Sequence, residues 1–138
     1  MAVISVENSL LLIRNHLLSN SSITNIVSDR VLTDHFYDFD NTTVQMPLII
    51  LDIEGGSANY GMEAQAMKMD VYCYSKTSSS QTVSLYDALY LALHAQRLSN
   101  DGIPTKGYAY ETERPDTGYN NQIRAWYSMG KYTVNLAG

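Results

Sequence analysis

The sequence predicts an α+β fold, with a mainly antiparallel sheet and two helices packed on one face. Two segments carry apolar residues at helical spacing, and several others alternate or run apolar in the way that strands do. Clusters of Gly, Pro and Asn separate these segments. The length of 138 residues is that of one ordinary domain, so we expect residues 1–138 to form a single unit.

The first part of the chain is predicted to be helical. Ser5 can cap a helix over 6–19. The apolar positions of this helix share one face: Val6, Leu10, Ile13 and Leu17. A further helical turn is expected over 23–27, followed by an extended step at 30–32. The segment 34–45, DHFYDFDNTTVQ, combines aspartates and aromatic residues without periodicity, which predicts a loop that presents its side chains outward.

Two strands in the middle of the chain are predicted to pair as an antiparallel hairpin. The first, 48–53, follows Pro47 and is apolar on both faces, as a central strand would be. Glycines mark the turn, and the second strand runs from Glu63 to Ser75. One face of this second strand is apolar and consists of Met67, Met69, Val71 and Cys73. The other face ends in Tyr72 and Tyr74, which we expect a helix or an adjacent subunit to cover.

A second long helix and two further strands complete the predicted order. Ser78 and Gln81 have the spacing of a capping box ahead of this helix. Its apolar stripe is formed by Leu85, Leu89, Ala92 and Leu93. Strands are expected over 108–112 and 122–135, around a segment rich in turn formers. The apolar residues of the last strand change parity at Gly130, which predicts either a β-bulge or a strand that passes from one environment to another.

Composition narrows the classes of function. The formal charge is −5, and the nine Lys and Arg residues are scattered, which disfavours a protein that grips nucleic-acid phosphates. No apolar run reaches the roughly 18 residues that a membrane-spanning helix needs, and the N-terminus lacks the basic start of a secretory signal. Eleven tyrosines outnumber the basic residues, and tyrosine is enriched at protein interfaces.

Residues with catalytic or metal-binding chemistry form no recognisable motif. Cys73 lies on the apolar face of its strand, which indicates a buried thiol. The histidines stand on separate predicted elements, and the acidic cluster around His35, formed by Asp34, Asp38 and Asp40, does not have Ca²⁺-loop spacing. Glu111 and Glu113 share one strand face and are the nearest approach to an acid/base pair. We therefore expect no enzymatic activity, no metal and no cofactor.

Several strings, taken in order, resemble the tail-completion or tail-terminator proteins of long-tailed bacteriophages. They are IVSDRVL (26–32), MPLIILDI (46–53), MDVYCYS (69–75), TVSLYDALYLAL (82–93) and the late strand with Met129, Tyr132 and Val134. The resemblance implies a six-fold ring in the virion neck, assembled in the host cytoplasm. Such a ring terminates the tail tube, joins it to the head-side connector, and lets DNA pass through without specific binding. Its partners would be copies of itself, the tube protein and the connector or stopper protein, with no membrane.

The resemblance implies that the protein works through its contacts with other subunits. The candidate interface residues are Asp34, Phe36, Tyr37, Asp38, Phe39, Asp40, Glu54, Tyr60, Glu63, Tyr72, Tyr74, Arg114, Tyr119 and Trp126. The net charge leads us to expect an acidic lumen, which would let DNA slide. A head-completion stopper or a minor tail ring protein fits the same pattern. A small Tyr-rich α+β binding module is the alternative from a different class, and a monomer in solution would favour it.

Overall fold

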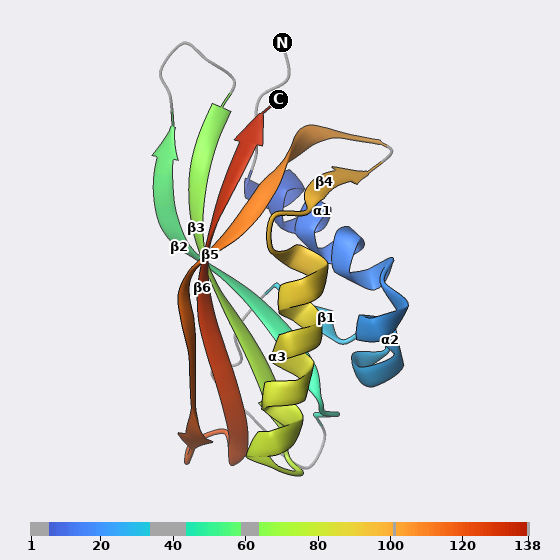
Figure 1. Ribbon diagram of the computed structural model, residues 1–138, viewed down its shortest axis with the longest axis vertical. Coiled ribbons are helices and arrows are strands. Elements are labelled where there is room, and N and C mark those ends of the chain that lie inside the picture. The colour runs from blue at the N-terminus through green and yellow to red at the C-terminus, as the bar shows by residue number, and fades with distance from the viewer. Residues whose placement is uncertain (1–5, 34–43, 59–63, 101, 138) are drawn as a thin grey trace.

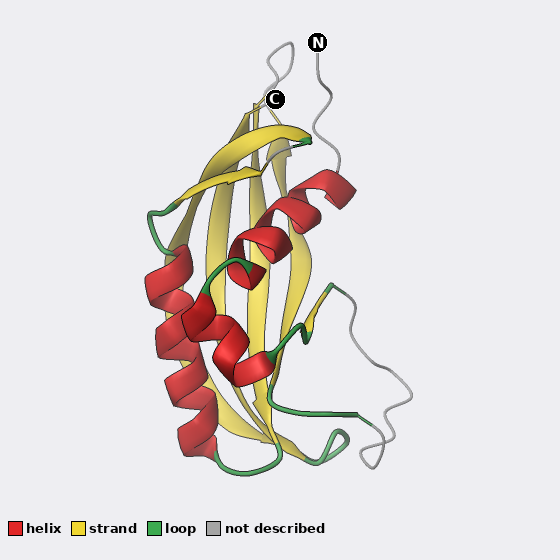
Figure 2. Ribbon diagram, turned by 90° about the vertical axis from the view of Figure 1, so that its right-hand side faces the viewer, coloured by secondary structure: helices red, strands yellow, loops and turns green. Residues whose placement is uncertain are grey.

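The computed structural model describes residues 6–33, 44–58, 64–100 and 102–137 (Figure 1). Three helices and six strands occur in the order α1 (Val6–Leu18), α2 (Ser21–Val27), β1 (Val31–Leu32), β2 (Leu48–Ala58), β3 (Ala64–Ser75), α3 (Ser79–Leu93), β4 (Arg97–Asn100), β5 (Ile103–Asn120) and β6 (Ala125–Ala137). The strands form one sheet in the order β1-β2-β3-β6-β5-β4. The helices lie on one side of this curled sheet (Figure 2).

The predicted fold class is wrong in two respects. The sheet is mixed, because β1 runs parallel to β2, with Val31 beside Ile49. Three helices accompany it instead of two, since α2 is a separate helix whose N-cap Asn20 accepts a hydrogen bond from the Ser22 backbone N–H. The parallel pairing depends on long-range contacts, such as the bond from Arg30 Nε to the Pro47 carbonyl at 2.9 Å. The extended step expected at 30–32 is β1, but two residues carry no periodic signal that could show with which strand they pair.

The main core lies between the helices and the sheet. It joins Leu12, Ile13 and Leu17 of α1 and Leu85 and Leu89 of α3 to the apolar face of β3. Half of the predicted capping box of α3 forms, with Ser78 Oγ accepting from the Gln81 N–H at 3.1 Å. The other half does not, because Gln81 Oε1 accepts from Ser75 Oγ and the Ser78 N–H donates to Ser75 Oγ. The antiparallel pairing of β2 with β3 is likewise confirmed.

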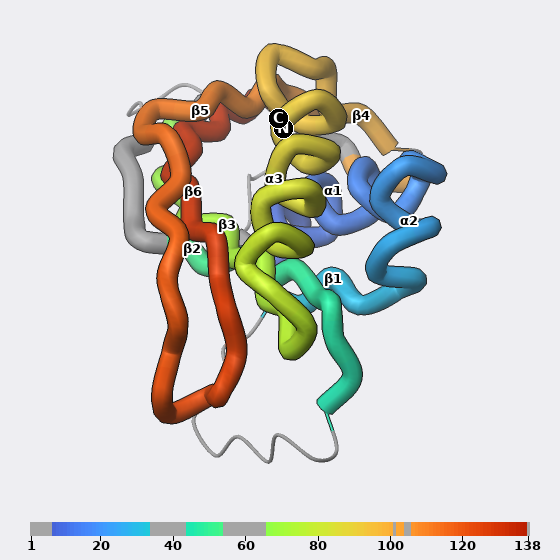
Figure 3. The backbone as a smooth tube through the Cα atoms, turned by 60° about the horizontal axis from the view of Figure 1, so that its bottom comes forward, coloured from blue at the N-terminus to red at the C-terminus, as the bar shows by residue number. Residues whose placement is uncertain are grey.

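The predicted boundaries fail most clearly in the C-terminal third. β4 was not predicted, and β5 extends through the segment expected to be a turn, so that the turn itself falls at 121–124. The pairing of β5 with β6 shifts register twice between Glu111 and Asp116, and Pro115 lies at the second shift within the strand. Figure 3 shows the long β5–β6 hairpin, with its end lying apart from the helices.

The parity of the apolar residues changes along β6 because the strand passes from one environment to another, and not because of a β-bulge. β6 pairs with β3 in unbroken register from Trp126 to Ala137, so no bulge interrupts this pairing at Gly130. The helix-facing positions before Tyr132 are Ser128 and Gly130, which are small because α3 packs closely there. Ser128 Oγ lies 2.9 Å from Thr82 Oγ1, and the ring of Tyr86 covers Gly130. The apolar residues on the opposite face belong to a second, smaller core.

Candidate interaction surface

The sheet face turned away from the helices carries the tyrosines that the sequence singled out. Side-chain alternation places Met69, Val71 and Cys73 in the core beneath the helices, so Tyr72 and Tyr74 must face the other way. Tyr74 is 3% exposed and belongs to the second core, which also contains Leu48, Ile50, Ile123 and Ala125. Of the two covers expected for these tyrosines, the helix is wrong, because α3 packs on the opposite face. Cover by an adjacent subunit stays a prediction.

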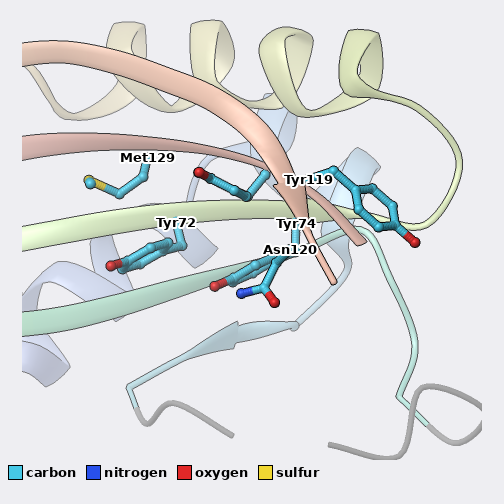
Figure 4. A pocket seen from close by; sticks show the side chains of 6 residues that line it. Tyr72, Tyr74, Tyr119, Asn120 and Met129 are labelled. Carbon is cyan, nitrogen blue, oxygen red and sulfur yellow. The ribbon is translucent and has the colours of Figure 1, made fainter. Parts of the chain in front are cut away.

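Three tyrosine rings on this face form the wall of an open pocket. The Tyr72 and Tyr74 rings are parallel within 4°, with centroids 5.7 Å apart, and the Tyr127 ring is tilted at 6.5 Å from that of Tyr74. A pocket of about 350 Å³ is lined by Tyr72, Tyr74, Tyr119, Asn120, Tyr127 and Met129. Figure 4 shows the rings of Tyr72 and Tyr74 side by side, whereas the ring of Tyr119 points away from them. We call Tyr72, Tyr74, Tyr127 and Met129 the aromatic pocket.

The register of β6 against its neighbours assembles the aromatic pocket. Tyr127 pairs with Tyr74, and Met129 pairs with Tyr72. On the other side, Gly118 of β5 pairs with Tyr127, and a Cβ atom at Gly118 would lie 2.8 Å from the Tyr127 hydroxyl oxygen. A side chain at position 118 would therefore require the hydroxyl end of Tyr127 to shift. Tyr127 and Met129 were not predicted, although their shared parity in β6 was visible in the sequence.

The aromatic pocket has three tyrosine hydroxyl groups, and one aspartate, Asp52, influences Tyr74. Burial raises the pKa of the Tyr74 hydroxyl well above its ordinary value, and the nearby Tyr72, Tyr127 and Asp52 raise it further. Asp52 of β2 stands in register with Asp70 of β3, and Asp70 is paired with Lys131, whose Nζ lies 3.3 Å from Asp70 Oδ1. The pocket thus combines aromatic faces with oxygen atoms that can accept hydrogen bonds.

Arg114 belongs to a separate network beside α3. Its Nη1 lies 2.9 Å from Glu111 Oε1, and its guanidinium carbon lies 5.3 Å from the centre of the Tyr90 ring. The other carboxylate oxygen, Oε2, accepts a hydrogen bond from the Tyr86 hydroxyl at 2.6 Å. The Glu111 N–H donates to Nδ1 of His94 at 2.9 Å. These contacts tie the irregular part of β5 to α3.

The same irregularity separates the two glutamates that resembled an acid/base pair. Glu111 stands in register with Tyr132, and Glu113 with Lys131, which is the next residue of β6. The two side chains therefore fall on opposite faces of the sheet, because consecutive positions of a strand alternate. Glu113 helps to line a separate polar pocket with Lys68 and Lys131. The expectation that Glu111 and Glu113 share a face is wrong.

The remaining candidate residues divide into three groups. Tyr119 and Trp126 pair across the end of the β5–β6 hairpin, with ring centroids 5.0 Å apart at 75°. Glu54 lies within β2. Outside the described residues are Asp34, Phe36, Tyr37, Asp38, Phe39, Asp40, Tyr60 and Glu63, together with the histidine of that loop, His35. The structure thus brings Tyr72, Tyr74 and Tyr119 to one pocket and keeps Arg114 elsewhere.

Two histidines and the cysteine lie within the described part of the chain and have structural surroundings. His16 Nε2 lies 2.7 Å from the Ala92 carbonyl oxygen, which links α1 to the end of α3. Cys73 is fully buried, and burial raises the pKa of its thiol. No three His, Cys, Asp or Glu side chains of the described residues come together as a metal site would require. None of the described helices is long and apolar enough to span a bilayer.

The fold has a counterpart among solved structures. No protein-family model matches the sequence, and no curated protein matches it. The fold resembles that of a chain in the structure described as "Virion of native gene transfer agent (GTA) particle", with a TM-score of 0.72. The match covers 97% of this chain and 100% of that chain at 8% sequence identity. At this identity the likeness establishes a shared fold over nearly all of this chain and all of the other.

Proposed function

We propose that the protein is a structural subunit of a phage-type virion. In this proposal it forms a six-fold ring in the neck, ends the tail tube, and joins the tube to the head-side connector. The observation that carries the proposal is the full-length fold likeness to a chain of a gene transfer agent virion. The resemblance of five sequence segments to tail-terminator proteins supports the finer assignment to the neck.

Open sheet edges support assembly with neighbouring subunits. Among the described residues, the outer edge of β5 pairs with no strand from Thr112 to Asn120, because β4 reaches only the beginning of β5. Beyond Ile50, where the pairing with β1 stops, the outer edge of β2 likewise pairs with no strand of the described part of the chain. Unpaired edges attract other strands unless they are covered. Two open edges on opposite sides of one sheet suit a head-to-tail contact, which closes into a ring when the rotation allows.

The proposed role requires no chemistry and no specific grip on DNA. Several basic side chains are engaged within the subunit. Arg14 Nε donates a hydrogen bond to the Val31 carbonyl at 2.8 Å, and Lys131 forms an ion pair with Asp70. With a net charge of −5 in each copy, a ring would repel phosphates along its lumen and allow DNA to slide. We therefore propose a non-enzymatic protein that works without a cofactor and whose partners are its own copies, the tube protein and the connector.

Electron microscopy of the purified protein tests the proposal. We expect rings with a central hole, either for the protein alone or after purified tail tubes are added, and density for the ring at one tube end. Binding to the connector but not to the tube would instead indicate a head-completion stopper. A particle that stays monomeric with both partners, and that is absent from purified virions by mass spectrometry, would contradict the virion role. That result would favour the binding-module alternative, which the aromatic pocket supports.

A further inference from the structure

We propose that the aromatic pocket receives an arginine side chain presented by a basic partner protein. The proposal concerns the chemistry of one site, and it stands whether or not the chain forms a ring. It assigns a role to Tyr72, Tyr74 and Tyr127 that goes beyond packing on the outer face of the sheet.

The shape of the pocket suits a flat cation. Parallel rings 5.7 Å apart present aromatic faces whose negative quadrupole attracts a cation. The volume of about 350 Å³ lies at the lower end of the range of ligand pockets, which fits one side chain better than an extended segment. The chain itself provides an example of this contact, since the exposed Arg114 lies over the Tyr90 ring.

The polar atoms of the pocket favour a group that donates hydrogen bonds. Tyr72 and Tyr127 line the pocket, and Asp52 lies two residues along β2 from Ile50, the register partner of Tyr72. Phenol oxygens and a carboxylate can all accept hydrogen bonds, while a guanidinium has five N–H donors and no acceptor. An arginine therefore matches the pocket better than a carboxylate or an apolar side chain would.

Charges around the pocket also favour a basic occupant. Asp52 is on one side, and Asp116 stands in register with Met129 on the other. Two lysines are engaged by other groups, Lys131 by Asp70 and Lys76 by the Val44 carbonyl. The sequence pI of about 4.9 gives the chain a net negative charge at neutral pH, which attracts a basic protein more strongly than another copy of the chain. We therefore assign the arginine to a different, basic protein.

A titration with two matched probes tests the site on the intact chain. N-acetyl-arginine amide carries the charge, and N-acetyl-citrulline amide has nearly the same shape without it. Binding is followed through the NMR signals of the Met129 methyl group and the tyrosine rings. We expect saturable shifts with the arginine probe, with a dissociation constant in the millimolar range, and at least about tenfold weaker binding of the citrulline probe. Equal binding of the two probes, or no saturable binding of the arginine probe, overturns the proposal.

Three substitutions locate the binding. Tyr72 is only half-buried, so Tyr72→Leu should leave the chain folded and weaken binding at least about tenfold, because it removes an aromatic face. Tyr72→Phe keeps that face and should retain affinity within about threefold. Tyr108→Leu is the matched control, since Tyr108 is an exposed tyrosine outside the pocket, in register with Asn135 on β6, and its loss should change nothing. Unchanged affinity in folded Tyr72→Leu overturns the assignment, and thermal unfolding checks that each variant is folded.

The source of the arginine is tested separately from the site. A self-association measurement compares the native chain with Tyr72→Leu, without any partner. We expect no difference, since the occupant belongs to another protein. If Tyr72→Leu instead dissociates an oligomer of the chain, a second copy supplies the arginine and the assignment to a basic partner is overturned.

Discussion

Replacing Gly130 by alanine tests whether α3 packs as closely on β6 as the structure indicates. Gly130 lies in the middle of β6, and the ring of Tyr86 lies directly over it. An added Cβ atom would overlap the Tyr86 hydroxyl oxygen and would lie 2.5 Å from Cζ and 2.7 Å from Cε2. Tyr86 is 1% exposed, so its ring has little room to move aside. The glycine is needed for space, because its φ lies outside the positive region that favours glycine.

The cost has two main contributions. Forcing extra volume into a packed core costs about 1–3 kcal/mol. Displacing the Tyr86 hydroxyl from Glu111 Oε2, now at 2.6 Å, removes a hydrogen bond to a charged group worth about 1.5–3 kcal/mol. The lower entropy of the unfolded alanine chain offsets about 0.4–1 kcal/mol. We therefore expect Gly130→Ala to lower the free energy of unfolding by about 2–5 kcal/mol and the melting temperature by about 8–20 °C.

Chemical denaturation and thermal unfolding provide the assay, with a double-mutant cycle as its control. In Tyr86→Leu the ring that meets the new Cβ is gone, so adding Gly130→Ala to it should cost at least about 1 kcal/mol less than in the native background. Gly118→Ala gives a milder comparison, because its nearest contact is the hydroxyl end of Tyr127, and we expect it to cost less than about 1 kcal/mol. If Gly130→Ala unfolds within about 0.5 kcal/mol of the native protein, the close packing of Tyr86 on β6 is refuted.

Three further predictions concern the α3 cap and buried titratable groups. Ser78→Ala should lower the free energy of unfolding by about 1 kcal/mol, because the Gln81 N–H loses its acceptor, whereas Ser78→Asp should retain most of the stability; an unchanged Ser78→Ala protein would show that the cap is dispensable. Burial raises the pKa of Tyr86, Tyr132 and Tyr74 above the unfolded value of about 10, so the native state holds these protons more tightly. Their contribution to stability is complete below pH of about 10 and is lost as the pH rises above it toward the folded pKa values; denaturation midpoints at increasing pH should fall there, and tyrosinate absorbance should appear together with unfolding. Burial also raises the pKa of the Cys73 thiol, so a thiol reagent should modify Cys73 only at the rate at which the chain opens, and fast modification of the folded protein would contradict its burial.

Periodic patterns in the sequence correctly located α1, α3 and the β2–β3 hairpin. In each case a run of apolar residues or a cap fixed the element locally, as Ser78 and Gln81 did for α3. The prediction failed where pairing between distant segments decided the outcome. β5 continues past Pro115 because β6 pairs with it on one side and α3 holds Glu111 through Tyr86, and neither contact leaves a local signal in the sequence.

The candidate interaction surface was also predicted in part from local pattern and decided in part by strand pairing. The sequence alone determined that Tyr72 and Tyr74 share one face of β3 and that Cys73 lies on the other, because side chains alternate along a strand. Only the tertiary structure decided which face the helices cover, and that Tyr127 and Met129 join the two tyrosines. The physical reason is that register is a property of two strands together. A shift of one residue between β3 and β6 would turn Tyr127 to the opposite face and leave no aromatic pocket.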